Sequence, residues 1–456
     1  MALELTRPPM SVFFMPTLHS GLEYTKPAPR WLMRPVKGAE ISAFAGSDNN
    51  ELFAEQAADI RASRARLLRT VFEVCCAPVV LKDARFRNSF ATIGGRIWLN
   101  GASGTRMRNK YGVNNREEWR RKRLVSAFMR ARRDGQGALP VTKDSPDGLD
   151  IALELKNGFN YYHFTTETLG ALAHFTSDET GRPIRFHLPK GEVKGFLSGF
   201  IRTIFPEIAD RVVFETELAK YDAVRSVYNH RHYLYQVNDP RVLRVAMAEG
   251  VDPRWGEVLY DPLANKDVAM ASYDSNLRML RQAALKQLPR SKVKGMPRLI
   301  WMGRDEKGGG ARARGLTGHE PLLEELRGRG FEMVAFENLS PLDQIAAAHS
   351  ADILIAPHGA GLANMTYAKP GALFIEIGTR QTQRHRWGDF LPSAHVSGCR
   401  YATVFADVTG FDGSSRVPPM SEGLLGVHIG RRATDQVVGL IDAAMPGLRM
   451  RSKVEA

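Results

Sequence analysis

The chain of 456 residues is poor in cysteine and has no long apolar run. Its three cysteines, Cys75, Cys76 and Cys399, give no disulfide framework, and the adjacent pair lies in an apolar run typical of a protein core. A membrane-spanning helix would need about 18 or more consecutive apolar residues, and the sequence has none. The stretch from Met1 to Met15 lacks the apolar segment of a signal peptide, so we expect a cytoplasmic protein.

Several motifs of familiar enzyme classes are also missing. The sequence contains no Gly-x-x-x-x-Gly-Lys phosphate loop, no Gly-x-Ser-x-Gly turn and no Cys-x-x-Cys pair. His230 and His232 could be two metal ligands, but two ligands without a third are weak evidence for a metal site. The sequence therefore predicts no metal site and none of the sites that these motifs mark.

Positive charge dominates the composition, with a formal net charge of +14. Residues 116–133 alone carry seven arginines and one lysine against two glutamates. A helix with this charge would attract nucleic acid, anionic lipid or an acidic polymer. The same residues could equally form a solvated helix face, and a basic protein also attracts a small anionic substrate. Charge alone therefore does not identify the binding partner.

The chain length suits two domains with an additional N-terminal module. Residues 1–50 are rich in proline and glycine, and residues 51–74 have helical spacing. Residues 78–99 look β-rich, with two extended runs that flank Gly94 and Gly95 as in a hairpin. This N-terminal part is predicted to be irregular at first and β-containing later.

Helical and extended patterns alternate in the rest of the chain, and a polar segment near residue 290 marks a domain boundary. Before it we expect helices over 162–175, 193–204 and 275–288 and strands over 184–188 and 211–214. After it we expect strands over 298–302, 331–336, 352–356 and 373–377 and helices over 320–327 and 341–349. Such alternation predicts a parallel sheet, in which ligands bind outside the carboxyl ends of the strands.

A strand followed by a turn of small residues, 353–364, is the most informative segment. Gly359, Ala360 and Gly361 leave backbone N–H groups open to a bulky ligand, and the N-terminus of the following helix favours negative charge. A phosphate-bearing ligand is therefore expected here. Asn364 stands where a dinucleotide fingerprint has its third small residue, so an NAD site is not favoured.

Each of three side chains near this turn has two possible roles. His358 can donate to a phosphate oxygen or pair with it, or it can only cap the loop. Asn364 can hydrogen-bond the ligand or support the loop. Glu376, near the end of the next strand, can accept both ribose hydroxyls of a nucleotide or form an internal salt bridge.

Arginines follow the strand predicted over 298–302. Arg304 stands where that strand ends, and Arg312 and Arg314 lie beyond a run of three glycines that is typical of a mobile loop. Guanidinium groups suit diphosphates and can stabilise a departing nucleoside diphosphate without a metal. Arg304 and Arg314 are the stronger candidates, because an exposed arginine such as Arg312 is usually a solvated charge.

His163 and Glu167 are four residues apart, so a helix would place them on one face. An imidazole beside a carboxylate is a plausible general base for a hydroxyl proton. A capped helix start with a local ion pair is an equally good interpretation.

These residues resemble the signature of the family 61 glycosyltransferases. The string from His358 to Asn364, followed by Pro370, Gly371 and Glu376, is similar to its C-terminal part. The resemblance extends to an "N-(F/Y)-Y-H" segment with a following acid and to an "R … R … N-E" segment. In this chain they correspond to residues 160–164 with Glu167, and to Arg304, Arg314 and Glu320. His319 replaces the expected asparagine, and a glycine-rich insertion lies between the arginines.

The resemblance, over roughly residues 155–380, implies an α/β fold of two Rossmann-like domains (GT-B-like), here with a β-containing N-terminal extension. We assign 1–150 to the extension, 151–290 to the acceptor domain and 291–456 to the nucleotide-sugar domain. The implied reaction is inverting transfer from a nucleotide sugar, mostly UDP-linked, to a glycan or lipid-linked hydroxyl in bacterial capsular or other surface polysaccharide synthesis. No metal or other cofactor is expected to be obligatory, and the sequence has no Asp-x-Asp motif for a metal-bridged diphosphate.

In this interpretation His163 or Glu167 accepts the acceptor proton. The expected donor-binding residues are Arg304, Arg314, His358, Gly359, Ala360, Gly361, Asn364 and Glu376. Residues 116–133 would then make a peripheral contact with the inner membrane, and nucleic acid is not an expected partner. Two alternatives stay open: a nucleic-acid or anionic-surface binding protein that uses 116–133, and an inactive family member that binds only an acceptor.

Overall fold

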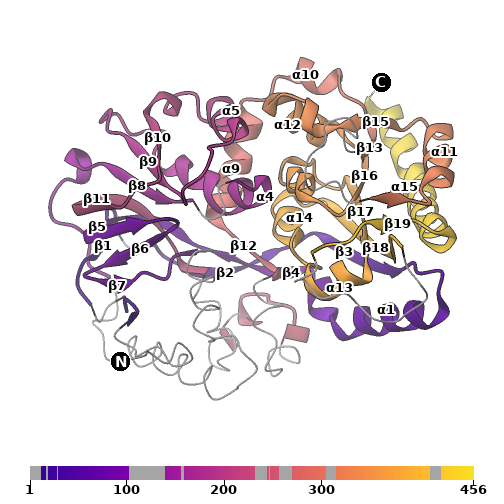
Figure 1. Ribbon diagram of the computed structural model, residues 1–456, viewed down its shortest axis with the longest axis horizontal. Helices are drawn as coiled ribbons and strands as arrows, with labels where there is room; N and C mark the ends of the chain where they lie inside the picture. Colours follow the sequence, from indigo (N-terminus) through magenta and orange to yellow (C-terminus); the bar gives the residue numbers. More distant parts are fainter. Residues whose placement is uncertain are drawn as a thin grey trace. The chain divides into compact units, whose positions relative to one another are not determined.

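The chain folds into two compact units (Figure 1). The computed structural model describes residues 12–16, 19–27, 29–101, 139–155, 159–231, 244–245, 247–255, 270–303, 315–410 and 423–455, the last of these by backbone alone from residue 448. Unit 1 comprises Met1–Val36 and Phe72–Ala283, and unit 2 comprises Lys37–Val71 and Ala284–Ala456. The chain passes between the units three times, and the last passage, after Ala283, lies close to the boundary predicted near residue 290.

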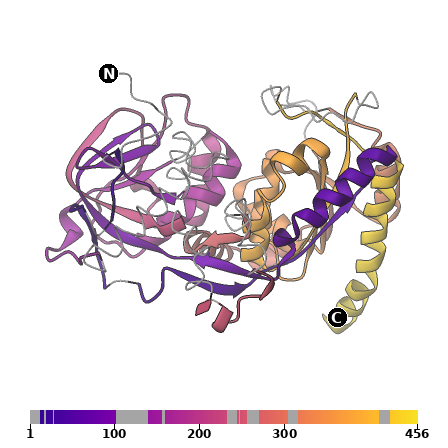
Figure 2. The same cartoon turned by 90° about the horizontal axis from the view of Figure 1, so that it is seen from below.

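The N-terminal residues are divided between the two units, which differs from the separate extension expected over 1–150. Strand β3 (Glu40–Ala45) pairs in parallel with β18 (Arg400–Val408) from the far end of the sequence. Helix α1 (Asn50–Ala62) follows β3 and packs against the C-terminal part of unit 2, as the indigo helix beside the orange and yellow elements in Figure 2 shows. The physical reason is that β3 hydrogen-bonds the edge of β18 that would otherwise be open.

Unit 1 contains a mixed sheet in the order β10-β9-β8-β11-β5-β6-β7, with β1 on β5. Its strands are β1 (Leu22–Tyr24), β5 (Cys76–Arg87), β6 (Phe90–Ile93), β7 (Arg96–Ile97), β8 (Ile151–Glu154), β9 (Ile184–His187), β10 (Val212–Glu215) and β11 (Ala219–Asn229). A small second sheet joins β12 (Ser272–Asp274), β4 (Thr70–Val74) and β2 (Met33–Lys37). The parallel part predicted from the alternation is present in β8, β9 and β10, but β11 runs antiparallel to β5.

Unit 2 contains a sheet in the order β14-β19-β18-β17-β16-β13-β15, with β3 on β18. The remaining strands are β13 (Leu299–Gly303), β14 (Leu316–Thr317), β15 (Glu332–Ala335), β16 (Ile353–Pro357), β17 (Leu373–Thr379) and β19 (Val427–His428). From β15 to β3 all neighbours pair in parallel. After β13 the chain adds β15 on one side of it and β16 on its other side, and β17 and β18 follow in order.

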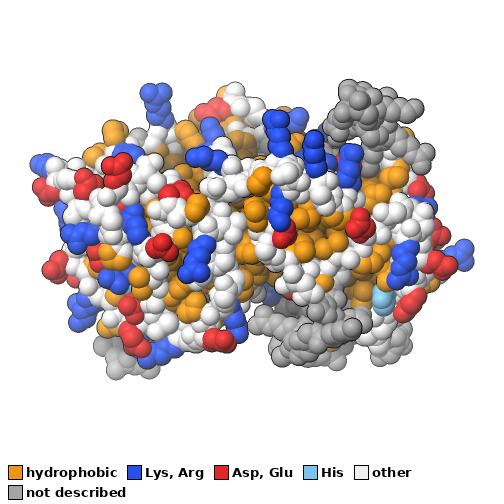
Figure 3. Space-filling view, turned by 90° about the horizontal axis from the view of Figure 1, so that it is seen from above, with side chains coloured by type: hydrophobic (Ala, Val, Ile, Leu, Met, Phe, Trp, Pro, Cys, Tyr) orange, Lys and Arg blue, Asp and Glu red, His pale blue; other side chains and the backbone are white. Residues whose placement is uncertain are grey.

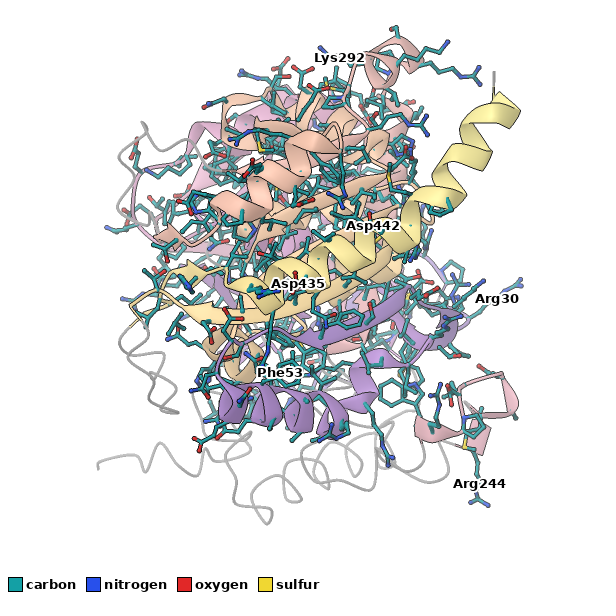
Figure 4. The ribbon with its side chains drawn as sticks, turned by 90° about the vertical axis from the view of Figure 1, so that its right-hand side faces the viewer. Arg30, Phe53, Arg244, Lys292, Asp435 and Asp442 are labelled. Carbon is teal, nitrogen blue, oxygen red and sulfur yellow. The ribbon has the colours of Figure 1, made fainter. Side chains whose placement is uncertain are left out.

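Helices cover both faces of this sheet (Figure 1). On one face lie α10 (Arg290–Lys294), α12 (Pro341–Ser350) and α14 (Leu391–Ser397), and on the other lie α11 (Glu320–Gly328) and α15 (Arg431–Glu455). Asp442 of α15, labelled in Figure 4, accepts a hydrogen bond from Arg329 just beyond α11. The core on the α11 and α15 face takes alternate residues of the strands, such as Ile375 and Ile377. The residue between them, Glu376, therefore points to the opposite face.

Most predicted elements are present in the part of the chain that the structure describes. The Gly94-Gly95 hairpin is confirmed as β6 and β7, and every strand predicted in the C-terminal part is found. The helix expected over 51–74 is wrong in its second half, because residues 70–74 form β4. The helix expected over 162–175 is a composite of α4 (Tyr161–His163), a π-helical segment (Phe164–Thr168) and a 3₁₀ segment (Leu169–His174). Among the described residues, no helix is long and apolar enough to cross a membrane.

Helix α1 is held to the C-terminal part of unit 2 by a buried arginine. Arg380, at the start of α13 (Arg380–His385), pairs with Glu55 at 2.9 Å and with Asp59 at 2.7 Å. Its side chain is 6% exposed, whereas Arg384, which approaches the same acids, is 45% exposed. A buried cation with two carboxylates is costly to leave unpaired, so this contact ties residues distant in sequence.

We expect Arg380→Met to lower the free energy of unfolding of unit 2 by about 1–3 kcal/mol, because two carboxylates lose their buried partner. Amide hydrogen exchange should speed up in β3 and α1 and stay unchanged in β5 and β11. Arg384→Met is the matched control and should lower the free energy of unfolding by less than about 0.5 kcal/mol. Equal effects of the two variants would contradict the anchoring role of Arg380.

Candidate active site

The strand order of unit 2 reverses between β13 and β16, which are neighbours in the sheet. Open α/β sheets bind ligands at such a switch point, where the chain departs in opposite directions from neighbouring strands. Gly303 ends β13, and Pro357 ends β16 directly before His358. The turn predicted to hold a phosphate therefore lies at the edge of the sheet where ligands bind.

The turn of small residues packs closely on β13. A Cβ atom added at Gly361 would lie 3.2 Å from the Sδ atom of Met302, closer than an ordinary van der Waals contact. The helix expected after the turn is a 3₁₀ helix, Ala360–Tyr367, in which the Leu362 N–H donates to the Gly359 oxygen at 3.1 Å. The first N–H groups of any helical turn have no partner inside the turn, and they favour an anion.

His358 is held at the start of this turn by both its backbone and its ring. Its N–H donates to the Ile377 oxygen at 2.9 Å, which continues the β16–β17 ladder. The side chain is 7% exposed, and its Nδ1 atom is hydrogen-bonded to Oε1 of Glu376. The ring packs against Phe390 with centroids 5.3 Å apart. The imidazole therefore has a fixed orientation.

The Glu376 carboxylate is enclosed by side chains of unit 2. It is 4% exposed, and its Oε2 atom accepts from the hydroxyl of Tyr401 and, at 3.5 Å, from that of Thr403. Burial and the nearby Glu376 carboxylate raise the pKa of Tyr401 well above its usual value, so Tyr401 stays a neutral donor. Of the two roles open for Glu376, these contacts match the internal one.

Asn364 also has contacts inside unit 2. Its amide nitrogen donates to the Gly361 oxygen at 3.0 Å and to Oε1 of Gln344 at 3.4 Å. The side chain is buried. These bonds support the loop, which is the second of the two roles considered for Asn364.

Several predicted features lie outside the described residues. They are Arg304, Arg312, Arg314, the three glycines between them, and the basic segment 116–133. Gly303, which directly precedes Arg304, is described and ends β13 at the switch point. Glu320 opens α11 with a mostly exposed side chain, 3.7 Å from the ring of His319.

Unit 1 brings His163 and Glu167 together as predicted. Nδ1 of His163 lies 3.0 Å from Oε2 of Glu167, a distance that fits an ion pair, although the angles fall outside the hydrogen-bond range. Asn160 caps the turn by accepting from the His163 N–H at 3.4 Å. Glu167 lies in the π-helical segment, a local form that is common at functional sites.

Glu167 also lines a small polar cavity of about 40 Å³ in unit 1. The cavity opens at the carboxyl ends of β8 and β11, and its lining is mostly amide, hydroxyl and carboxyl groups, among them Asn100, Glu154, Ser226 and Asn276. A volume of this size holds a few water molecules and not a whole nucleotide.

Sequence reasoning missed Glu154, which ends β8. Its oxygens accept from the Ala91 N–H at 2.8 Å and from the Asn100 amide at 3.1 Å. Burial raises the pKa of Glu154 to about 8 despite these two donors. The available signal was an acid that closes an apolar strand, Ile151-Ala152-Leu153-Glu154, the same pattern that drew attention to Glu376.

The sequence over residues 161–375 matches the family model described as Glycosyltransferase 61. The chain carries a glycosyltransferase family 61 domain. This domain makes the protein a glycosyltransferase with a donor and an acceptor substrate, and it confirms the resemblance noted from the motifs. No curated protein matches the chain.

The family 61 domain spans both candidate groups of residues. It begins at Tyr161, in the turn that carries His163 and Glu167, and it ends at Ile375, directly before Glu376. It includes the whole turn from His358 to Asn364. The β3 and α1 segment that completes unit 2 lies outside the match.

His230, considered above as a metal ligand, is part of the unit 1 core. Its ring nitrogens contact the Tyr24 hydroxyl at 3.0 Å and the Cys75 oxygen at 2.8 Å, and burial lowers its pKa to about 4. Within the described ranges, no group of three or more His, Cys, Asp or Glu side chains is arranged to hold a metal ion.

The raised pKa of Glu154 predicts a specific pH dependence of stability. Its usual value is 4.5, so the folded protein holds this proton more strongly than the unfolded chain does, and the free energy of unfolding falls as pH rises from about 4.5 to about 8. Glu154→Gln removes this contribution. We compare the free energies of unfolding of the variant and wild type, measured with urea at pH 5 and at pH 9. From pH 5 to pH 9 the difference should shift in favour of the variant by on the order of a few kcal/mol.

The exposed Glu217 provides the control, since its side chain is 67% exposed and pairs only weakly with Lys190. Glu217→Gln should leave the pH dependence unchanged. A Glu154→Gln protein whose stability relative to wild type is the same at both pH values would rule out this account of the buried acid.

Proposed function

We propose that the protein transfers a sugar, with inversion, from a UDP-linked donor to a hydroxyl of a glycan or lipid-linked acceptor in bacterial capsular or other surface polysaccharide synthesis. The observation that carries the proposal is the turn of small residues with His358 at the switch point of the unit 2 sheet. The family 61 domain supplies the reaction class. The assignment of a GT-B-like pair of Rossmann-like domains belongs to the same proposal.

The donor diphosphate is proposed to bind at the carboxyl ends of β13 and β16. The N–H groups of Gly359, Ala360 and Gly361 and the His358 ring would face its oxygens, and Arg304 and Arg314 would neutralise its charge. Such donors stabilise the negative charge that develops on a leaving diphosphate. With them in place, the reaction needs no obligatory metal or other cofactor.

The acceptor is proposed to bind to unit 1, where His163 and Glu167 lie. The acceptor oxygen attacks the anomeric carbon while the bond from that carbon to the diphosphate breaks, which inverts the configuration. Either His163 or Glu167 removes the hydroxyl proton. Their 3.0 Å contact lets one of them orient the other, and the choice between them stays open.

The donor assignment predicts binding of a nucleoside diphosphate. In a thermal-shift panel of UDP, GDP and CMP, we expect UDP to raise the melting temperature by a few °C. In the presence of EDTA, UDP release from UDP-sugars should persist. His358→Ala should lower the rate of UDP release about 100-fold, because a hydrogen-bond donor to the leaving group is lost.

His395 offers a matched control in the same unit. It is a buried histidine on α14 whose Nδ1 accepts from the Ala39 N–H at 3.1 Å, next to the amino end of β3. His395→Gln should keep UDP binding and activity, even if the melting temperature falls. Full activity of a folded His358→Ala protein, or no response to any of the three nucleotides, would reject the donor site.

The acceptor assignment predicts a loss in turnover without a loss in donor binding. Glu167→Gln and His163→Gln should leave the UDP dissociation constant unchanged, and the variant that lacks the base should lower kcat by about 100-fold or more. Glu192→Gln, an exposed acid of unit 1, is the control. Normal kcat in both His163→Gln and Glu167→Gln would remove this pair from the mechanism.

The alternative of an anionic-surface or nucleic-acid binder rests on residues 116–133. On the face shown in Figure 3, basic and acidic side chains of the described residues are interspersed. The family 61 domain favours the enzyme. We therefore propose that the protein acts in the cytoplasm and that 116–133 contacts the inner membrane, where a lipid-linked acceptor would lie.

A further inference from the structure

Glu376 lies inside its strand, one pairing position before the last residue of β16, Pro357. Strand β17 continues for three residues to Thr379, so the Glu376 backbone is about 10 Å from the end of the strand. Its partner in the β16 ladder is Ala356, two residues before His358. A carboxylate at this depth reaches the ring of His358 more readily than it reaches a ribose above the edge.

The surroundings of the carboxylate support the same conclusion. One oxygen is hydrogen-bonded to Nδ1 of His358, and the other accepts from the hydroxyls of Tyr401 and Thr403 on β18. All of these side chains are buried. A ribose would have to reach a carboxylate whose side chain is only 4% exposed.

A carboxylate on one ring nitrogen determines what a histidine presents on the other. When Nδ1–H donates to a carboxylate, the hydrogen is fixed on Nδ1, the ring cannot rotate freely, and Nε2 is directed away from the carboxylate. The same arrangement orients histidines in metal sites, where loss of the carboxylate costs about 10–100-fold in affinity or activity. Tyr401 and Thr403 in turn orient the carboxylate.

We propose that Glu376 is a positioning residue that sets the hydrogen placement and direction of the His358 ring for the donor diphosphate, and that Tyr401 holds Glu376 for this task. This inference rests on the proposed donor site. It replaces a ribose contact of Glu376 with an indirect effect on the phosphates. The nucleoside is then recognised by other residues.

The test is a double-mutant cycle with UDP and uridine as probes. The proteins are wild type, Glu376→Gln, His358→Gln and the double variant, and calorimetry gives the dissociation constants. Glu376→Gln should weaken UDP binding about tenfold, because an amide no longer specifies which ring nitrogen carries the hydrogen. Uridine, which has no phosphate, should bind as before. In the His358→Gln background, Glu376→Gln should have no further effect.

Two further variants separate positioning from folding. Tyr401→Phe keeps the ring but removes a donor to Glu376, and it should weaken UDP binding by a smaller factor, on the order of threefold, only when His358 is present. Asp352→Asn is the matched control, a buried carboxylate at the amino end of β16 that pairs with Arg298 and Lys369. It should lower the melting temperature and leave UDP affinity unchanged.

The outcomes distinguish this inference from the proposed function. Equal loss of uridine and UDP affinity in Glu376→Gln would show a ribose contact and overturn the inference while the donor site stands. Additive losses in the double variant would overturn it as well. If the wild-type protein binds neither UDP nor another nucleoside diphosphate, the proposed function itself fails.

Discussion

The parallel pairing of β16 with β17 is the constraint on which the rest of the site depends. The register that pairs Ala356 with Glu376 is continued by the bond from the His358 N–H to the Ile377 oxygen. A slip of one residue would turn Glu376 to the α11 and α15 face and leave a carboxylate in an apolar core. The apolar alternation of β17 prevents that slip, so the packing that stabilises the sheet also places the site.

Two acids in apolar strands have different surroundings. Glu376 in β17 has an imidazole and two hydroxyls around it, whereas Glu154 in β8 has one backbone N–H and one amide beside a polar cavity. The first arrangement fixes the orientation of a neighbour. The second keeps a carboxyl protonated near neutral pH, a state that can donate a hydrogen bond to a hydroxyl-bearing molecule.

The sequence predicted the C-terminal sheet well because its strands are short apolar runs separated by capped helices. Ser340, for example, caps α12 by accepting from the Asp343 N–H, and Pro341 occupies the first turn. The pairing of β3 with β18 could not be predicted, since it joins residues about 360 positions apart and no local pattern encodes it. The helix expected over 51–74 ended early for the same reason, because β4 takes its conformation from its partners in a sheet.

The chemistry of the site was predictable in part. Residue types and spacing identified the turn, His358 and the pair of His163 and Glu167, since each depends on neighbours close in sequence. The partners of Glu376 were not predictable, because Tyr401 and Thr403 come from a strand that the sequence analysis did not recognise. Glu154 was missed because its raised pKa results from burial by residues as distant as Ala91 and Asn100.

The central claim is that the backbone of the turn after β16 binds a diphosphate. A crystal structure of the protein with UDP tests it most directly. The account predicts both phosphates within about 3 Å of the N–H groups of Gly359 to Gly361, with Nε2 of His358 facing a phosphoryl oxygen. Well-ordered UDP bound elsewhere, with this turn unoccupied, would contradict it.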